Sequence, residues 1–133
     1  MLKILIVEDS TSAQKQIKSI LKPYAQCILA TNGKIALEKV EEALKAEEPF
    51  DLIITDVIMP EMDGLSAAKR IRELEQSYAL GKRQIIIVLT VVQKPKNILQ
   101  AQYECGADAY ISKPYTRTNV LETINNCGFE LKP

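Results

Sequence analysis

The stretch that decides the fold is Phe50–Gly64, which reads FDLIITDVIMPEMDG. Within it, the aliphatic run Leu52–Thr55 has the length and composition of a β-strand, and it ends directly at the carboxylate of Asp56. A loop that carries Pro60 leads from this carboxylate to Gly64, where a helical period begins. The segment therefore predicts a strand, a loop and a helix in succession.

The same order of strand and helix recurs on both sides of this stretch. Further runs of strand length are Leu2–Val7, Cys27–Ala30, Gln84–Thr90 and Ala109–Ser112. Segments with helical spacing of apolar residues follow the strands at Ala13–Tyr24, Ile35–Leu44, Leu65–Leu74, Lys94–Cys105 and Thr116–Asn126. Five βα units in a row predict an α/β fold, a single doubly wound parallel sheet with right-handed crossovers and helices on both faces.

Length and composition limit the class of protein. At 133 residues, 47% apolar and 26% charged, the chain has the size of one domain and enough apolar residues for a core. Its 17 basic and 17 acidic side chains balance, so no net positive charge draws it to nucleic acid or to an anionic membrane. We therefore expect neither as a direct partner.

Histidine is absent from the sequence, and the three cysteines are far apart. Chemistry that needs a histidine nucleophile, a histidine base or a histidine zinc ligand is excluded. Cys27, Cys105 and Cys127 form no CxxC pair, which favours a reducing compartment over a disulfide scaffold. The first apolar run is short and ends in acidic residues, unlike a signal peptide, so we expect a cytoplasmic protein.

Polar side chains follow or end four of the five predicted strands. Glu8 and Asp9 follow the first strand, Asp56 the third and Lys113 the fifth, and Thr90 ends the fourth. Because ligands bind at the carboxyl edge of open parallel sheets, we expect these groups to converge there. Crowded carboxylates repel one another unless a cation relieves them, and hard oxygen ligands without histidine or nearby cysteine indicate Mg²⁺.

The same residues suit phosphoryl transfer. A carboxylate can act as a nucleophile and form an aspartyl phosphate, and Asp56 is free to take this role. Lys113 offers a compact positive charge to a phosphoryl oxygen, and the Thr90 hydroxyl offers a hydrogen bond. Because phosphoryl transfer depends on positioning and charge neutralisation, the lack of a histidine base does not oppose it.

Taken together, these motifs resemble the receiver domain of response regulators in two-component systems, the CheY-like family. The resemblance covers residues 2 to about 127 and rests on motifs in the family's order: Glu8-Asp9, Asp56 opening DVIMPEMDG, Thr90, and Tyr110–Ser112 leading into Lys113-Pro114. It implies a flavodoxin-like (βα)5 domain over residues 1–127, with strands in the order 2-1-3-4-5. Residues 128–133 would form a C-terminal tail.

The resemblance also implies a role for each site residue. Asp56 would be the phosphoacceptor. Asp9 and Asp56 would bind Mg²⁺ directly, together with the backbone carbonyl oxygen of Ile58, and Glu8 would act through water. Lys113 would pair with the phosphoryl group, and its peptide bond to the following proline would be cis.

A switch and a set of partners follow from the same resemblance. Thr90 would move toward the phosphoryl group and Tyr110 would turn inward, although ordinary packing at the sheet edge is an equal alternative for Tyr110. The donor would be a phosphohistidine on a sensor histidine kinase or a histidine phosphotransfer protein. A downstream protein target would bind the face formed by the fourth helix, fifth strand and fifth helix, and phosphorylation could also drive dimer formation.

Three apolar residues near the predicted phosphoryl site depart from the family's pattern or bear on its chemistry. Val91 follows Thr90 where the family usually has a small residue, and its bulk is expected to hinder small donors. Ile58 and Val92 lie two positions beyond Asp56 and Thr90, where the access of a hydrolytic water is influenced in the family. Our hypothesis is that both shield the acyl phosphate, so Ile58→Asn would release phosphate faster.

Other functions are weighed against this interpretation. An aspartate-based phosphohydrolase commonly carries a second aspartate two residues after its nucleophile, where this chain has Ile58. An interaction module that is never phosphorylated is opposed by the acidic set and Lys113, and a flavin or nucleotide binder by the lack of a glycine-rich loop after the first strand. We expect a signalling domain, free-standing or part of a larger regulator or hybrid kinase, with no activity beyond its own phosphorylation and slow dephosphorylation.

Overall fold

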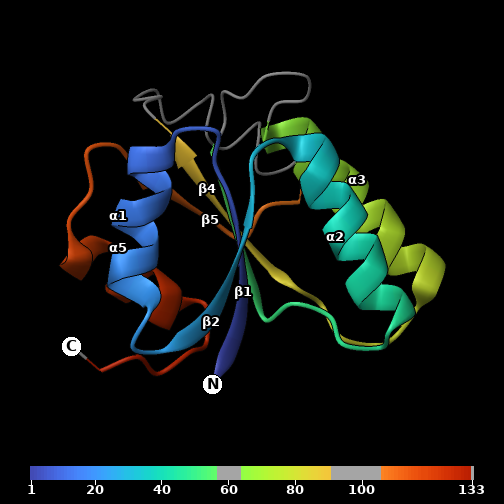
Figure 1. Ribbon diagram of the computed structural model, residues 1–133. Coiled ribbons are helices and arrows are strands. Elements are labelled where there is room, and N and C mark those ends of the chain that lie inside the picture. Colours follow the sequence, from blue (N-terminus) through green and yellow to red (C-terminus); the bar gives the residue numbers. More distant parts are fainter. Residues whose placement is uncertain (57–63, 91–105, 133) are drawn as a thin grey trace.

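A computed structural model of the protein describes residues 1–56, 64–90 and 106–132. Five parallel strands form one sheet in the order β2-β1-β3-β4-β5 (Figure 1). The strands are β1 Leu2–Val7, β2 Ala25–Ala30, β3 Leu52–Asp56, β4 Ile85–Thr90 and β5 Ala109–Ser112. The predicted parallel α/β sheet and its strand order are confirmed.

Helices flank the sheet on both faces. Those that the structure describes are α1 Thr11–Leu21, α2 Gly33–Lys45, α3 Gly64–Tyr78 and α5 Arg117–Asn126. Helices α1 and α5 cover one face, and α2 and α3 cover the other (Figure 1). The predicted helix Lys94–Cys105 lies outside the described residues, as do Ile58, Val91 and Val92.

The central strands contribute to two separate cores because successive side chains of a strand point to opposite faces of the sheet. In β1, Ile4 and Ile6 pack toward α1 and α5, whereas Leu5 and Val7 pack toward α2 and α3. All four are buried. A strand covered on both faces therefore reads as an unbroken aliphatic run rather than as an alternating pattern.

Polar caps determine where three of the helices begin. The side chains of Ser10 and Asn32 accept hydrogen bonds from backbone N–H groups in the first turns of α1 and α2. Thr116 and Asn119 form a reciprocal capping box at the start of α5. The cap predicted at Ser10 is confirmed, and it starts α1 directly after the acidic pair that follows β1.

The edge of the sheet where the strands begin is held by an ion-pair network. Arg72 lies on α3, and its Nη1 and Nη2 atoms contact Glu75 Oε1 at 2.6 Å and Asp108 Oδ2 at 2.7 Å. Its Nε donates to the carbonyl oxygen of Gly106 at 3.0 Å. Arg83 Nη2 contacts the second oxygen of Asp108 at 2.8 Å. The network ties α3 to the segments that lead into β4 and β5.

Residues 128–132 pack back onto the face formed by α1 and α5. Leu131 is buried in that core, and its backbone N–H donates to Asn125 Oδ1 at 2.6 Å. The Asn125 amide donates in return to the Leu131 carbonyl oxygen at 2.9 Å. The Tyr24 hydroxyl donates to the carbonyl oxygen of Lys132. This segment is thus anchored to the domain at both its side chains and its backbone.

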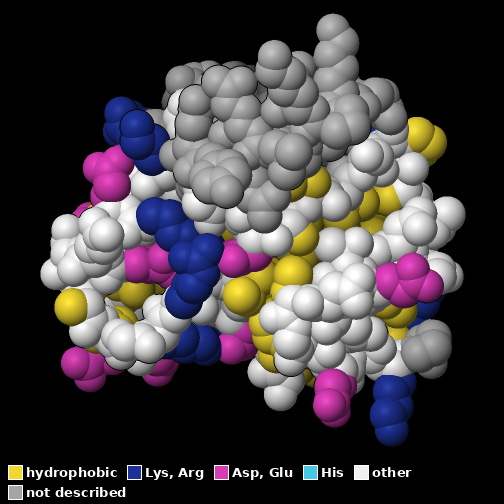
Figure 2. All heavy atoms as spheres, turned by 180° about the vertical axis from the view of Figure 1, so that it is seen from behind, with side chains coloured by type: hydrophobic (Ala, Val, Ile, Leu, Met, Phe, Trp, Pro, Cys, Tyr) yellow, Lys and Arg dark blue, Asp and Glu magenta, His cyan; other side chains and the backbone are white. Residues whose placement is uncertain are grey.

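Charges of both signs are mixed over the face shown in Figure 2. There, the side chains of Lys and Arg lie beside those of Asp and Glu, with apolar side chains between them. Within residues 1–56, 64–90 and 106–132, no helix is long and apolar enough to cross a membrane.

Candidate functional site

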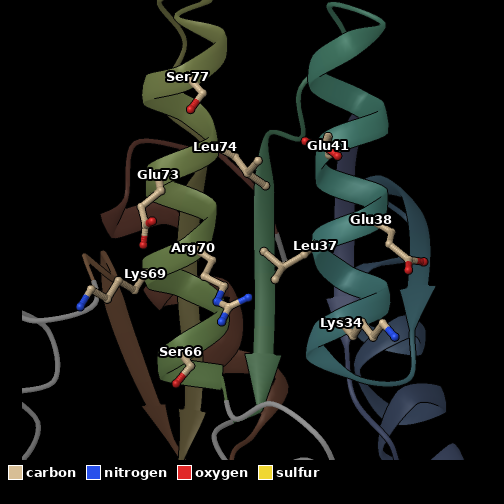
Figure 3. A pocket seen from close by; sticks show the side chains of 10 residues that line it. All are labelled: Lys34, Leu37, Glu38, Glu41, Ser66, Lys69, Arg70, Glu73, Leu74 and Ser77. Atoms are coloured by element: carbon tan, nitrogen blue, oxygen red, sulfur yellow. The ribbon is translucent and has the colours of Figure 1, made fainter.

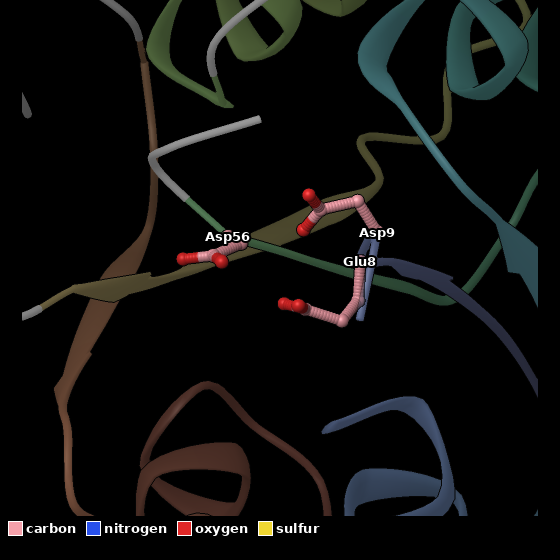
Figure 4. A group of neighbouring side chains, drawn as sticks. All are labelled: Glu8, Asp9 and Asp56. Atoms are coloured by element: carbon pink, nitrogen blue, oxygen red, sulfur yellow. The ribbon is translucent and has the colours of Figure 1, made fainter. Parts of the chain in front are cut away.

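The carboxyl ends of β1 and β3 bring three carboxylates together (Figure 4). Glu8 and Asp9 follow β1, and Asp56 is the last residue of β3. The two strands are parallel neighbours with Val7 opposite Thr55, so the residues that come next on each strand meet. Carboxylate oxygens of the three acids lie within 4.8 Å of one another. We call these three residues the acidic cluster.

Glu8 is the most buried member of the acidic cluster, with 3% of its surface exposed. Its Oε1 accepts a hydrogen bond from the backbone N–H of Ser10 at 3.1 Å. Its Oε2 is buried and has no hydrogen-bond partner among the described residues. Burial raises the pKa of Glu8 to about 7, and the neighbouring Asp56 adds to the rise, against the lowering by the Ser10 N–H and Lys113.

An ammonium group faces the cluster from the far side of β3. Lys113, which follows β5, places its Nζ 3.0 Å from Asp56 Oδ1. The backbone N–H of Lys113 donates to the carbonyl oxygen of Thr90 at 2.8 Å, which fixes the chain as it leaves the sheet. The Lys113-Pro114 peptide bond is cis, as the resemblance implies. Lys113 and the cluster, far apart in the sequence, therefore form one site.

Thr90 and Tyr110 lie on the neighbouring strands β4 and β5. Thr90 is the last residue of β4, is buried, and pairs in register with Ser112. Tyr110 is half-buried and packs against the core beneath α2 and α3. The structure thus places Thr90 at the same edge of the sheet as Asp56, one position beyond the Asp56–Leu89 pair. It places Tyr110 two residues earlier along β5 than Ser112.

Tyr115 is a further residue close to the cluster that the sequence did not single out. Its side chain is half-buried and packs against the core beneath α1 and α5. Burial raises the pKa of the Tyr115 phenol to about 12, and the negative charges of Glu8 and Asp56 add to that rise. In the sequence, its position two residues after Lys113 is the feature that could have suggested a place near the site, but this spacing does not indicate where the hydroxyl points.

The acidic cluster has the donor set that Mg²⁺ prefers. All of its ligand atoms are carboxylate oxygens, which are hard ligands, and the described residues place no histidine or cysteine among them. The orphaned, buried Oε2 of Glu8 is a polar atom whose desolvation is uncompensated. A divalent cation would relieve both the repulsion between the acids and this lost hydrogen bond. The residues present therefore fit a magnesium ion.

A groove of about 970 Å³ lies elsewhere on the molecule, between α2 and α3 (Figure 3). Leu37 and Leu74 point into it from the two helices. Its rim carries three basic and three acidic side chains, namely Lys34, Lys69, Arg70, Glu38, Glu41 and Glu73. No member of the acidic cluster lines it. Its balanced charge is typical of solvated helix faces, so the acidic cluster remains the candidate site.

Comparisons with known proteins agree with this geometry. The profile of the response regulator receiver domain matches residues 4–125. Chemotaxis protein CheY of Bacillus subtilis is 33% identical over 125 residues, which covers 92% of this chain and 94% of CheY. Histidine kinase 3 of Arabidopsis thaliana is 33% identical over 140 residues, but the match covers 92% of this chain and only 13% of that kinase.

Solved structures point the same way. The receiver domain of the histidine kinase CKI1 from Arabidopsis thaliana, complexed with Mg²⁺ and BeF₃⁻, superposes with a TM-score of 0.81 at 29% identity. The superposition covers 94% of this chain and 88% of that domain. The chain thus spans nearly the whole of a CheY protein and about a tenth of the large kinases that it matches.

Proposed function

Because this chain belongs to the response regulator receiver domain family, we propose that it accepts a phosphoryl group on Asp56 and thereby changes its affinity for a partner protein. The observation that carries the proposal is the arrangement around Asp56. One of its oxygens lies 3.0 Å from the Lys113 ammonium, and its carboxylate lies within 4.8 Å of those of Glu8 and Asp9. A nucleophile, a cation-binding cluster and a positive charge for the phosphoryl group are therefore within one site.

In this proposal each residue of the site has a stated role. Asp9 and Asp56 hold Mg²⁺, joined by the backbone carbonyl oxygen of Ile58, and Glu8 contributes through water. The bound ion supplies positive charge that neutralises phosphoryl oxygens. Lys113, whose Nζ lies 3.0 Å from Asp56 Oδ1, would pair with the phosphoryl group. Thr90 donates its hydroxyl to a phosphoryl oxygen and, with Tyr110 on β5, forms the switch.

The donor would be a phosphohistidine outside these 133 residues, because they contain no histidine. An oxygen of the Asp56 carboxylate forms the new bond to phosphorus, the bond between phosphorus and the histidine nitrogen breaks, and the leaving imidazole takes up a proton. A sensor histidine kinase or a histidine phosphotransfer protein of the cytoplasm would supply this group. The aspartyl phosphate then hydrolyses slowly, so the chain acts as a signal rather than as a turnover enzyme.

The output of the proposed switch is a protein surface. Thr90 ends β4 and Tyr110 lies on β5. We infer that a shift of both side chains alters the face formed by the predicted fourth helix, β5 and α5. A downstream protein, or a second copy of the chain, binds this face with an affinity that depends on phosphorylation. Linkage requires that the bound partner favour the phosphorylated state by the same factor by which phosphorylation raises the affinity for the partner.

Incubation with acetyl phosphate and Mg²⁺, followed by intact mass spectrometry, tests the proposal. We expect the wild type to gain the mass of one phosphoryl group, and Asp56→Ala to gain none. A phosphohistidine donor is tested in parallel, because Val91 is expected to hinder a small donor more than a protein. Phosphorylation that persists in Asp56→Ala, or its absence from the wild type with both donors, would contradict the proposal.

A further inference from the structure

The loop that carries Glu8 and Asp9 is held by a side chain of the following helix. Gln14 lies in α1 and is half-buried, and its Nε2 donates to the backbone carbonyl oxygen of Glu8 at 2.5 Å. The backbone N–H of Gln14 donates in turn to the carbonyl oxygen of Ser10 at 2.9 Å. Gln14 therefore connects the first turn of α1 to the end of β1, across the loop that carries the acids.

Glu8 is fixed at three points as a result. Its backbone N–H donates to the carbonyl oxygen of Ala30 on β2 at 2.9 Å, and its Oε1 accepts from the Ser10 N–H at 3.1 Å. The Gln14 amide secures the remaining polar group of the residue, its carbonyl oxygen. This third contact differs from the others because it fixes the peptide unit between Glu8 and Asp9.

The orientation of that peptide unit determines where the two carboxylates point. The carbonyl of Glu8 and the N–H of Asp9 belong to one rigid plane, so holding that carbonyl restricts the ψ angle of Glu8 and the φ angle of Asp9. A change in either angle alone would move the two side chains relative to each other. Adjacent carboxylates repel one another when no cation lies between them, and repulsion favours such a change. A side chain that holds the plane therefore keeps both acids directed at Asp56.

We propose that Gln14 is a positioning residue for the acidic cluster, which fixes the Glu8–Asp9 peptide unit and so raises the affinity of the cluster for Mg²⁺ without contacting the ion. The proposal rests on the proposed function, since it takes Mg²⁺ to be the ion that the cluster binds. Groups that orient ligands from behind commonly influence metal affinity strongly. Gln14 acts here through the backbone of Glu8 rather than through a ligand side chain.

Two variants remove the amide donor. Gln14→Met keeps the length of the side chain, and Gln14→Ala removes most of it. Loss of one hydrogen bond at this position is expected to weaken Mg²⁺ binding about threefold to tenfold. Gln16→Met is the matched control, because Gln16 is exposed on the same helix and the structure gives it no contact with the loop among the described hydrogen bonds. We expect wild-type affinity for the control.

Calorimetric titration of the unphosphorylated protein with Mg²⁺ gives the first measurement. The second is the rate of phosphorylation from a phosphohistidine donor as a function of Mg²⁺ concentration. For Gln14→Met we expect the half-saturating concentration of Mg²⁺ to rise by the same factor as the dissociation constant, with the rate at saturating Mg²⁺ within about twofold of wild type. Replacing a residue that served folding alone would not raise the half-saturating Mg²⁺ concentration while leaving the rate at saturating Mg²⁺ unchanged.

The outcomes are distinct. If wild type binds Mg²⁺ and either folded variant of Gln14 binds it with unchanged affinity, the positioning role is wrong while the proposed function stands. If wild type binds no Mg²⁺ and is not phosphorylated, the proposed function itself fails. Far-ultraviolet circular dichroism identifies the folded variants. A loss of affinity as large in Gln16→Met as in Gln14→Met would also overturn the inference, because the effect would then belong to the helix as a whole.

Discussion

Replacing Glu8 by Gln should make the metal-free protein more stable at neutral pH, because burial in the folded state disfavours the ionised form of the Glu8 carboxyl. Burial, with Asp56 nearby, raises the pKa of this carboxyl from 4.5 to about 7. Below pH 4.5 both folded and unfolded chains carry the proton. As the pH rises to 7, the unfolded chain loses its proton first, and the free energy of unfolding therefore falls.

The size of the effect follows from the same shift. A rise from 4.5 to about 7 corresponds to about 3 kcal/mol at about 1.4 kcal/mol per pH unit. Part of this stabilisation is already lost at pH 5, so we expect the free energy of unfolding of the wild type to fall by about 2 kcal/mol between pH 5 and pH 7.5. Glu8→Gln has no proton to lose. Its stability relative to wild type should therefore grow by that amount over this interval.

Urea denaturation monitored by circular dichroism, with a chelator present, measures both proteins at each pH. Glu38→Gln on the exposed surface of α2 is the control, because an exposed glutamate has no burial penalty to relieve. Adding Mg²⁺ should shrink the difference, since a cation favours the ionised form of Glu8. A difference between Glu8→Gln and wild type that is the same at pH 5 and pH 7.5 would refute the reasoning.

Three other predictions concern two residues at the edge where the strands begin and one residue near the acidic cluster. Arg72→Met leaves Asp108 and Glu75 without the cation that they share, and it should lower the free energy of unfolding by about 3 kcal/mol in urea denaturation. The control Arg70→Met, on the exposed side of α3, should change the free energy of unfolding by less than about 0.5 kcal/mol. Gly106→Ala should cost about 2 kcal/mol in the same assay, because Gly106 has a φ of +75° and an added Cβ would lie 3.0 Å from Arg72 Cγ. In an ultraviolet absorbance titration of the folded protein, Tyr115→Phe should remove a phenol that ionises at about pH 12. The wild type should lose stability as the pH rises from 10 to 12, because this phenol ionises first in the unfolded chain.

Much of the fold could be predicted because the strands are buried on both faces. An unbroken aliphatic run such as Leu2–Val7 marks such a strand regardless of what packs on it, and this strand is found at the predicted bounds. Parallel pairing then brings every carboxyl end to one edge, so Glu8 and Asp56 meet although 47 residues lie between them. The convergence of the acids thus follows from topology, not from local preference.

The boundaries of helices and strands were less predictable, because they depend on pairing with neighbouring strands and on packing against the core. Strand β2 begins at Ala25 rather than Cys27, since Ala25 and Gln26 pair in register with the first two residues of β1. Helix α3 continues past Leu74 to Tyr78, whose side chain packs against the core beneath α2 and α3. Neither strand pairing nor packing of this kind is visible in the residues of the segment itself.

Side-chain contacts across the fold were beyond sequence reasoning for the same reason. Gln14 and Arg72 both occupy polar positions on helices, where their patterns are typical of solvent-exposed faces. In the structure, Gln14 reaches the end of β1, and Arg72 reaches the segments before β4 and β5. A helix pattern gives the face on which a polar residue lies but not the partner that it finds there.

The two edges of the sheet differ in how their charges are paired, and this difference is the strongest sign of where function lies. At the edge where strands begin, the acids Glu75 and Asp108 are matched by Arg72 and Arg83 at 2.6 to 2.8 Å. At the carboxyl edge, the described ion pairs give the three carboxylates of the acidic cluster a single ammonium, that of Lys113. A chain shaped only by stability would replace one of these acids with a neutral side chain, because like charges crowded together oppose folding. Among the described residues, this crowding of carboxylates therefore marks the place where a cation would bind and offset the negative charge of a phosphoryl group.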